Sequence, residues 1–152
     1  MTKINEQNEQ KERKRLSAVI NRPVTSSRMR YNRIDIPETY RDLAESEFTD
    51  DYTMGYTHET GFRAGTCTPF YFYDINLEIR QPIRVHPFAV HDYAFANLTN
   101  SAEILDKIAV LYEQVKMVDG DFITIFSNEL LGGSTSVNWL ELYRTVLDKH
   151  DV

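Results

Sequence analysis

The chain has 152 residues, of which 41% are hydrophobic and 26% are charged, and its formal net charge is −6. This balance is typical of one globular domain and excludes a chain that is disordered along most of its length. There is one cysteine, which excludes an internal disulfide, and the sequence shows neither a membrane-spanning run nor a secretory signal, so we expect a reducing, cytoplasmic setting without a membrane partner.

The N-terminal region is predicted to start with a disordered tail over residues 1–10, before a single α/β domain over residues 11–150. A helix is expected from about Gln10 to Ile20, where apolar residues recur at helical spacing. The expected inward face of this helix consists of Leu16, Val19 and Ile20.

Charge is distributed unevenly along the chain. Residues 1–50 contain ten Lys or Arg and nine Asp or Glu, whereas residues 51–152 contain seven and fourteen. Residues 13–33 contain seven basic side chains and no acidic one. Such a run can mark a nucleic-acid surface. The acidic remainder would repel a polyanion, so we favour a solvated helix face with scattered arginines and do not expect nucleic acid as a partner.

The pattern predicts three short elements before the middle of the chain. Residues 24–29 are a strand candidate, and residues 51–55 are expected to be extended. A helix is expected from Pro37, because proline is favourable at the first helical position. One side of this helix carries Tyr40, Leu43 and Ala44.

Residues 61–74 read GFRAGTCTPFYFYD and place one arginine between two glycines, directly before a run of aromatic side chains. Residues 68–73 alternate in the way that a strand requires, since successive side chains of a strand point to opposite faces. One face is expected to carry Phe70 and Phe72, and the other Tyr71 and Tyr73.

The second half of the chain contains the clearest helix, over residues 101–118. Asn100 with Glu103 three residues later resembles a capping box. Before this helix, residues 83–90 are expected to be extended, although Pro87 interrupts them. The apolar residues that recur at helical spacing are Ile104, Leu105, Ile108, Leu111, Tyr112 and Val115.

The last elements are a strand and a helix. Residues 121–126, DFITIF, are predicted to form a buried strand, and residues 130–136, LLGGSTS, a flexible loop. Residues 138–149 are expected to be helical, with Asn138 in a capping position. The residues expected to face inward are Trp139, Leu140, Tyr143, Val146 and Leu147.

Helix and strand therefore alternate along the chain, which predicts an α/β fold of parallel strands joined by crossover helices. Four or five strands are enough for a half-barrel or a small layered sheet. In such folds, functional groups collect at the carboxyl ends of the strands. The polar residues beside the expected strands are Arg63, Asp74, His91, Asp92, Ser127, Asn128 and Glu129.

Arg63 is the strongest single candidate for a functional residue. Other backbone can approach a guanidinium closely when glycines flank it, and the guanidinium offers a planar fork to a carboxylate. A buried arginine must find an anion, which Asp74, Asp92 or Glu129 could supply. The alternative is a surface arginine in a loop.

Other catalytic chemistry has weaker support in the sequence. His86 and His91 are five residues apart, which places them on opposite faces of a strand, and no HxxxH pattern occurs, so this chain is not expected to hold a metal by itself. Ser127 is not in a GxSxG elbow and fits a turn or a cap. Cys67 has no activating base nearby in the sequence and fits a small packing residue.

Six segments, taken in order, resemble the C-terminal part of bacterial polysaccharide deacetylase-like proteins, a carbohydrate esterase group. The segments are VTSSRMRYNR, IPETYRDL, DDYTMGY, GFRAGTCTPFYFYD, VHPFAVHD and FITIFSNELL. The resemblance extends from about Lys11 to Asp148. Because that family has a distorted seven-stranded (β/α) barrel, the resemblance implies a partial barrel, roughly its C-terminal half.

The resemblance also implies a metal-dependent N-deacetylase, in which a divalent ion such as zinc assists hydrolysis of an amide bond. The family's aspartate base and Asp-His-His metal triad lie in TFDDG and HxxxH motifs, and neither motif occurs in this sequence. Arg63 matches the arginine that steadies the catalytic aspartate, and Asp92 matches the acid that orients a late histidine. Ser127 stands where that histidine would be.

The resemblance therefore leads us to expect a C-terminal fragment, a split-gene product or a degenerate half of a deacetylase, inactive as an isolated chain. A separate N-terminal half or a second copy is the expected protein partner. A non-catalytic carbohydrate-binding or interaction module is the alternative, followed by a nucleic-acid binder through residues 13–33. The residues expected to contact a saccharide are Asp74, Ser127, Asn128 and Glu129.

Overall fold

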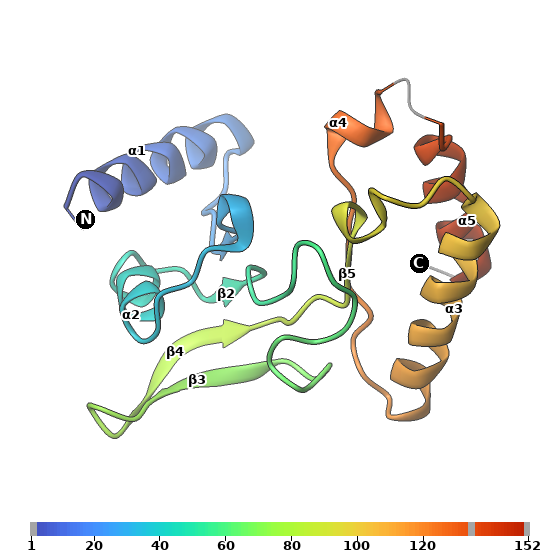
Figure 1. Cartoon of the computed structure of the whole chain (residues 1–152). Coiled ribbons are helices and arrows are strands. Elements are labelled where there is room, and N and C mark those ends of the chain that lie inside the picture. The colour runs from blue at the N-terminus through green and yellow to red at the C-terminus, as the bar shows by residue number, and fades with distance from the viewer. Residues whose placement is uncertain (1–2, 134–135, 151–152) are drawn as a thin grey trace. The chain divides into compact units, whose positions relative to one another are not determined.

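The computed structural model describes residues 3–133 and 136–150 (Figure 1). The chain divides into two compact units, which are treated separately below. Unit 1 consists of residues 1–53 and 70–86, and unit 2 of residues 54–69 and 87–152.

Unit 1 begins with helix α1, Lys3–Ile20, which starts earlier than the expected Gln10. Its sequence is rich in Lys, Glu and Gln, which are good helix formers. The expected inward face is wrong, because Leu16 and Ile20 are exposed and Val19 is 75% exposed. Leu16 and Val19 instead line an open pocket together with Val24, Leu43 and Phe48, so this side of α1 faces unit 1 without being buried.

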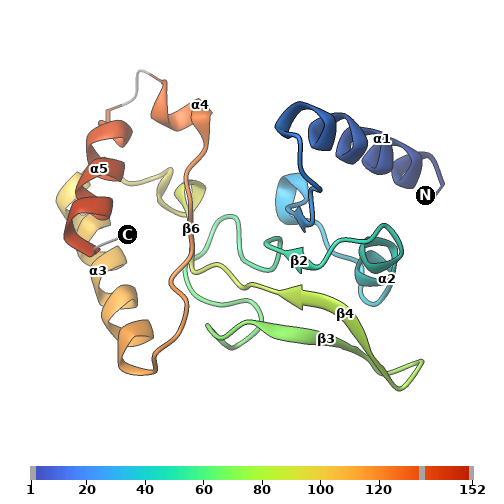
Figure 2. The same cartoon turned by 180° about the vertical axis from the view of Figure 1, so that it is seen from behind.

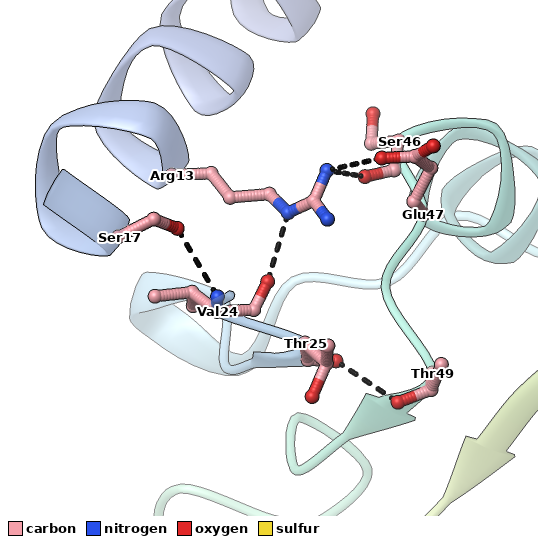
Figure 3. A network of polar contacts seen from close by, with 7 residues as sticks. All are labelled: Arg13, Ser17, Val24, Thr25, Ser46, Glu47 and Thr49. Carbon is pink, nitrogen blue, oxygen red and sulfur yellow. Dashed lines mark hydrogen bonds and ion pairs between the residues drawn. The ribbon is translucent and has the colours of Figure 1, made fainter. Parts of the chain in front are cut away.

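Polar contacts connect α1 to the rest of unit 1 instead (Figure 3). The Arg13 guanidinium donates to the carbonyl oxygens of Val24 at 2.8 Å and Ser46 at 2.7 Å, and it pairs with Glu47 at 3.0 Å. The Ser17 hydroxyl accepts a hydrogen bond from the Val24 backbone N–H at 3.1 Å. Arg13 is thus a structural residue of unit 1.

A four-stranded sheet forms the centre of unit 1, with the strand order β1-β2-β4-β3. The β1–β2 and β2–β4 pairs are parallel, as the sequence predicts. The β3–β4 pair is antiparallel, so the expectation of parallel strands throughout is wrong. The strands are β1 Ser26–Ser27, β2 Asp50–Asp51, β3 Phe70–Asp74 and β4 Ile79–Val85.

The antiparallel β3–β4 pair arises from a tight turn that was not predicted from the sequence. The Asp74 carboxylate accepts hydrogen bonds from the backbone N–H groups of Asn76 and Leu77, at 3.1 and 3.2 Å. An Asp that bonds its own backbone two residues on is a common turn-forming device. A four-residue connection is too short for a crossover between parallel strands, so the chain has to reverse.

Helix α2, Glu38–Glu45, covers one face of this sheet, where Tyr40 and Leu43 are buried. The predicted alternation of β3 is confirmed, since Phe72 is buried on the α2 side and its tyrosine neighbours are exposed. The rings of Tyr40 and Phe72 lie 4.6 Å apart. A short 3₁₀ helix, Arg30–Asn32, precedes α2.

Unit 2 is built on a two-stranded parallel ladder of β5 with β6 and on a helical layer. Helices α3 and α5 lie side by side (Figure 2). The apolar core between them contains Ile104, Ile108, Trp139, Leu142 and Val146, together with Val90 and Phe95. The elements are β5 Val90–His91, a 3₁₀ helix Asp92–Phe95, α3 Ser101–Met117, β6 Thr124–Ile125, α4 Asn128–Leu131 and α5 Trp139–His150.

Asn100 and Asn138 are confirmed as N-cap residues of α3 and α5. The Asn100 side chain accepts from the Ala102 N–H at 3.0 Å, and the Asn138 side chain accepts from the Glu141 N–H at 3.2 Å. The expected inward position of Leu140 is wrong, because it is 42% exposed while Leu142 is buried.

The expected extended run over residues 83–90 is divided between the two units. β4 ends at Val85 and β5 begins at Val90, with Pro87 between them. Proline has no N–H group to continue a ladder, which explains the interruption. Of the expected loop 130–136, Leu130 and Leu131 belong to α4, and residues 134 and 135 lie outside the described part.

The fold is therefore mixed α/β, with no closed barrel in the described residues. Residues 3–133 and 136–150 also contain no helix that is both long and apolar enough to cross a membrane.

Candidate functional site

The candidate site lies in unit 2, where β5 and β6 end side by side. His91 ends β5 and Asp92 follows it, while Ser127 follows β6 after one further residue. Because the two strands are parallel, their carboxyl ends meet at one edge, as expected for a functional site. We call His91, Asp92, Tyr93, Ser127 and Glu129 the Asp92 cluster.

Asp92 is fully buried at the centre of the cluster. Its Oδ2 accepts from the Ser127 backbone N–H at 2.5 Å and from the Ser127 hydroxyl at 2.6 Å. Its Oδ1 accepts from the Tyr93 N–H at 2.8 Å and lies 2.7 Å from the Nδ1 atom of His91. Burial raises the pKa of Asp92, but the hydrogen bonds from His91 and Ser127 outweigh it and hold that pKa below the ordinary 3.8.

The outer part of the cluster is more open. The Tyr93 hydroxyl donates to the exposed Glu129 carboxylate at 2.6 Å, and this bond raises the pKa of Tyr93. The Tyr93 ring stacks on His91 at 5.3 Å, and the ring of the exposed His58 lies 6.5 Å from it. Asn128, beside Glu129, is also exposed. Aromatic faces, a carboxylate and an amide therefore lie close together at this rim.

Histidine, aspartate and serine meet here, but their order differs from that of a nucleophilic triad. A triad needs the serine hydroxyl to donate to the imidazole, which the aspartate then orients. In this cluster the Ser127 hydroxyl donates to Asp92 itself. The geometry thus leaves Ser127 without a base and gives it the role of holding Asp92.

Arg63 lies on a turn of unit 2, in which the Gly65 N–H donates to the Phe62 carbonyl at 3.0 Å. Its side chain is exposed. The flanking Gly61 and Gly65 have φ of 104° and 71°, which explains why glycine stands there. A Cβ added at either position would meet nothing within 4 Å, whereas the Gly61 backbone N–H donates to the Ala89 carbonyl at 2.8 Å, so other backbone does approach at Gly61.

Asp74 lies in unit 1, where its buried carboxylate is bound by Arg41 at 2.5 and 2.8 Å. The hydrogen bond from Arg41 lowers the pKa of Asp74. The guanidinium partner of Asp74 is therefore Arg41, where the sequence suggested Arg63. Because β3 runs against the other strands, Asp74 also lies at the amino end of β4 rather than at the shared carboxyl edge.

A second polar group, which the sequence reading missed, occupies the carboxyl edge of the unit 1 sheet. The buried Asp51 accepts from the hydroxyls of Ser27 at 2.9 Å and Thr53 at 2.6 Å, and burial raises the pKa of Asp51. His86 Nε2 lies 2.7 Å from Asp50, and its ring stacks on Tyr52. The adjacent pair Asp50-Asp51 in an otherwise extended stretch was the available signal.

The described residues do not form a metal centre. No group of three or more His, Cys, Asp or Glu is placed to hold an ion within residues 3–133 and 136–150. His86 pairs with Asp50 and His91 with Asp92, each within its own unit. This donor set does not fit the zinc that a complete deacetylase would use.

Cys67 lines a pocket of about 490 Å³ in unit 2, together with Phe62, Leu111 and Val115. A Cβ placed on Gly120 would lie 2.2 Å from the Cys67 Sγ, so the thiol packs closely against that glycine. Its geometry agrees with the expected packing role.

In the comparisons with known proteins, no family model, no curated protein and no solved structure matches this chain.

Proposed function

We propose that this chain is a polysaccharide deacetylase-like protein that binds a saccharide at the Asp92 cluster without hydrolysing it. The supporting observation is the fixed Asp92 carboxylate between the ends of β5 and β6, which holds Ser127 where the resembling family has a histidine. We also propose that the fold is part of a (β/α) barrel. The parallel pairs β1–β2, β2–β4 and β5–β6 support this proposal.

Binding is favoured over hydrolysis by the chemistry of the cluster. Both oxygens of Asp92 already accept hydrogen bonds, so this carboxylate is poorly placed to take a proton from water. Ser127 has no base, and the sequence contains neither TFDDG nor HxxxH. We therefore propose that Asp92 and Ser127 neither activate water nor protonate a leaving amine.

The rim of the cluster supplies the groups that a sugar ring requires. The carboxylate of Glu129 and the amide of Asn128 can bond hydroxyl groups, and the ring of Tyr93 offers an apolar face with a polar tip. Because the Tyr93–Glu129 bond fixes both side chains in advance, less rotamer freedom is lost on binding.

Titration calorimetry with acetylated chito-oligosaccharides tests this proposal. We expect measurable binding that Glu129→Gln weakens about tenfold, the size expected for one lost charged hydrogen bond. Glu113→Gln, on the exposed side of α3, is the matched control and should bind as the unaltered chain does. Flat traces across several oligosaccharides would contradict saccharide binding.

An acetate-release assay with added zinc or cobalt tests the second half of the proposal. We expect no release above the protein-free blank. Turnover that rises with protein concentration would show that the chain is an enzyme and that the missing motifs are replaced by other residues.

The nucleic-acid alternative through residues 13–33 loses support from the geometry of Arg13. This side chain is only 19% exposed and donates to two backbone carbonyls, so it is not available to a phosphate. This observation removes Arg13 alone from the basic run, and the saccharide proposal is favoured because of the contacts of the Asp92 cluster described above.

A further inference from the structure

We propose that β3 of unit 1 pairs with the β3 of a second copy, so that two chains associate through a continuous sheet. This inference does not rest on saccharide binding. β3 is the last strand in the order β1-β2-β4-β3, so within the described residues its outer edge pairs with no strand. An exposed edge presents a row of backbone N–H and C=O groups that can accept another strand.

The sequence of β3 does little to block such pairing. Its five residues, FYFYD, contain neither the Lys nor the Pro that commonly protects a strand edge, although the pairing with β4 shifts register between Tyr71 and Tyr73. Aromatic residues also have high strand propensity.

The hairpin around this edge exposes an unusual concentration of apolar side chains. Five large hydrophobic residues within nine positions are exposed, and Ile75 reaches 80% exposure. The Arg80 guanidinium lies over the Tyr71 ring, 4.6 Å from its centroid, so this surface is apolar with a cation beside it. Exposed apolar side chains that gather on a folded protein often mark an interaction surface. The five residues, called the hairpin patch below, are Tyr71, Tyr73, Ile75, Leu77 and Ile79.

β3 is complementary to itself when two copies run antiparallel about a two-fold axis through Phe72. This register places Tyr71 opposite Tyr73 of the second copy, and such aromatic cross-strand pairs stabilise a sheet. The only charged residue of the strand, Asp74, would face Phe70 of the second copy, and Arg41 already neutralises it. No like charges within the two strands come to lie opposite each other, which makes a second copy a suitable partner.

The size of the hairpin patch sets the expected strength of association. About half of each tyrosine remains exposed, and a fully buried aromatic side chain contributes roughly 150–250 Å². The proposed register pairs the tyrosines and leaves the aliphatic residues outside the paired strands, so two copies would bury less than roughly 1,000 Å², which is the size of weak, transient interfaces. We therefore expect a weak dimer that forms at high micromolar protein concentration.

Sedimentation equilibrium of the full chain over a wide concentration range tests this inference. We expect a monomer–dimer equilibrium whose dissociation constant rises at least tenfold in Tyr73→Lys, because two like charges are then brought to the centre of the interface. Val110→Lys, at an exposed position of α3, is the matched control and should leave the constant unchanged. Equal thermal melting of both variants would show that neither change unfolds the chain.

A monomer at every concentration would overturn the inference, and so would equal effects of the two lysine substitutions. A mixture of isotope-labelled and unlabelled chains identifies the contact directly. We expect nuclear Overhauser effects between the rings of Tyr71 and Tyr73 of different copies. Contacts between copies through Leu16 and Val19 of α1 would also overturn the inference. So would tyrosine signals that change with saccharide concentration and not with protein concentration.

Discussion

Unit 1 and unit 2 both bury aspartates, but they satisfy the carboxylates in different ways. In unit 1, Asp74 has a guanidinium partner, whereas Asp51 accepts hydrogen bonds from two hydroxyls and one backbone N–H. In unit 2, Asp92 accepts hydrogen bonds from Ser127 and from the Tyr93 backbone N–H, and it pairs with the Nδ1 atom of His91. The comparison indicates that the donors around a buried carboxylate decide in which direction its pKa moves: burial raises the pKa of Asp51, whereas the donors to Asp74 and Asp92 lower theirs.

Charge is also divided unequally between the units. Unit 1 contains twelve Lys or Arg and twelve Asp or Glu, whereas unit 2 contains five and eleven, so unit 2 accounts for the whole net charge of −6. Unit 2 has a surplus of carboxylates, and their repulsion raises the free energy of an ionised Asp92. The hydrogen bonds from Ser127 and Tyr93 offset this cost.

The largest effect should come from breaking the Asp74 pair. Arg41→Met leaves the fully buried Asp74 carboxylate without its cation, and an uncompensated buried charge is destabilising although the Arg41 side chain is itself 27% exposed. We expect the greatest fall in melting temperature among the variants considered, measured by circular dichroism. The double variant Arg41→Met/Asp74→Asn removes the charge and keeps the turn acceptor, so it should recover part of the loss.

An unchanged melting temperature of Arg41→Met would show that Asp74 relies on its two turn N–H groups alone. In that case the two units would treat their aspartates alike, with backbone and hydroxyl donors in both.

The Asp92 cluster should respond less strongly than the Arg41 pair. Asp92→Ala leaves the Ser127 N–H and hydroxyl and the Tyr93 N–H without an acceptor, which we expect to cost about 3 kcal/mol in the free energy of unfolding. Asp92→Asn keeps one acceptor and should cost about half as much. Chemical denaturation at neutral pH measures both.

The loss at position 92 should also depend on pH. Since the folded pKa of Asp92 lies below 3.8, its ionised form stabilises the fold above that pH, and the contribution disappears as the pH falls through the folded pKa. The difference between the unaltered chain and Asp92→Asn should therefore shrink in acid. A difference that stays constant down to pH 2 would mean that the hydrogen bonds do not depend on the charge.

Local patterns allowed much of the fold to be predicted from the sequence. The helices after Asn100 and Asn138 and the alternation of β3 depend on neighbours a few residues apart, and the structure confirms them. Asp92 and Ser127 are two of the polar residues expected beside strand ends, and the parallel pairing of β5 and β6 brings them together.

Pairings between distant residues could not be predicted. Arg41 and Asp74 are 33 positions apart, and nothing in the spacing favours Arg41 over Arg63 as the partner. The antiparallel β3–β4 hairpin followed from an Asp-x-Asn turn that contains no glycine or proline, so the usual hairpin signals were absent. Apolar spacing likewise gave no information on whether anything covers Leu16 and Val19.

The smallest effect, and the sharpest test of the comparison, concerns the pH dependence of Asp51. Burial raises the folded pKa of Asp51 above 3.8, so ionising it costs more in the folded than in the unfolded chain. Its contribution to stability is therefore fully present below pH 3.8 and is lost as the pH rises through the folded pKa. Asp51→Asn stays neutral, so its stability relative to the unaltered chain should increase over this interval, as measured by thermal unfolding at a series of pH values.

Ser27→Ala removes one hydroxyl donor and should move the interval to higher pH. The opposite sign would be a fall in the stability of Asp51→Asn relative to the unaltered chain as the pH rises. It would mean that two hydroxyls and one N–H stabilise an ionised carboxylate as well as the Asp92 cluster does. The contrast between the units would then depend on Arg41 alone.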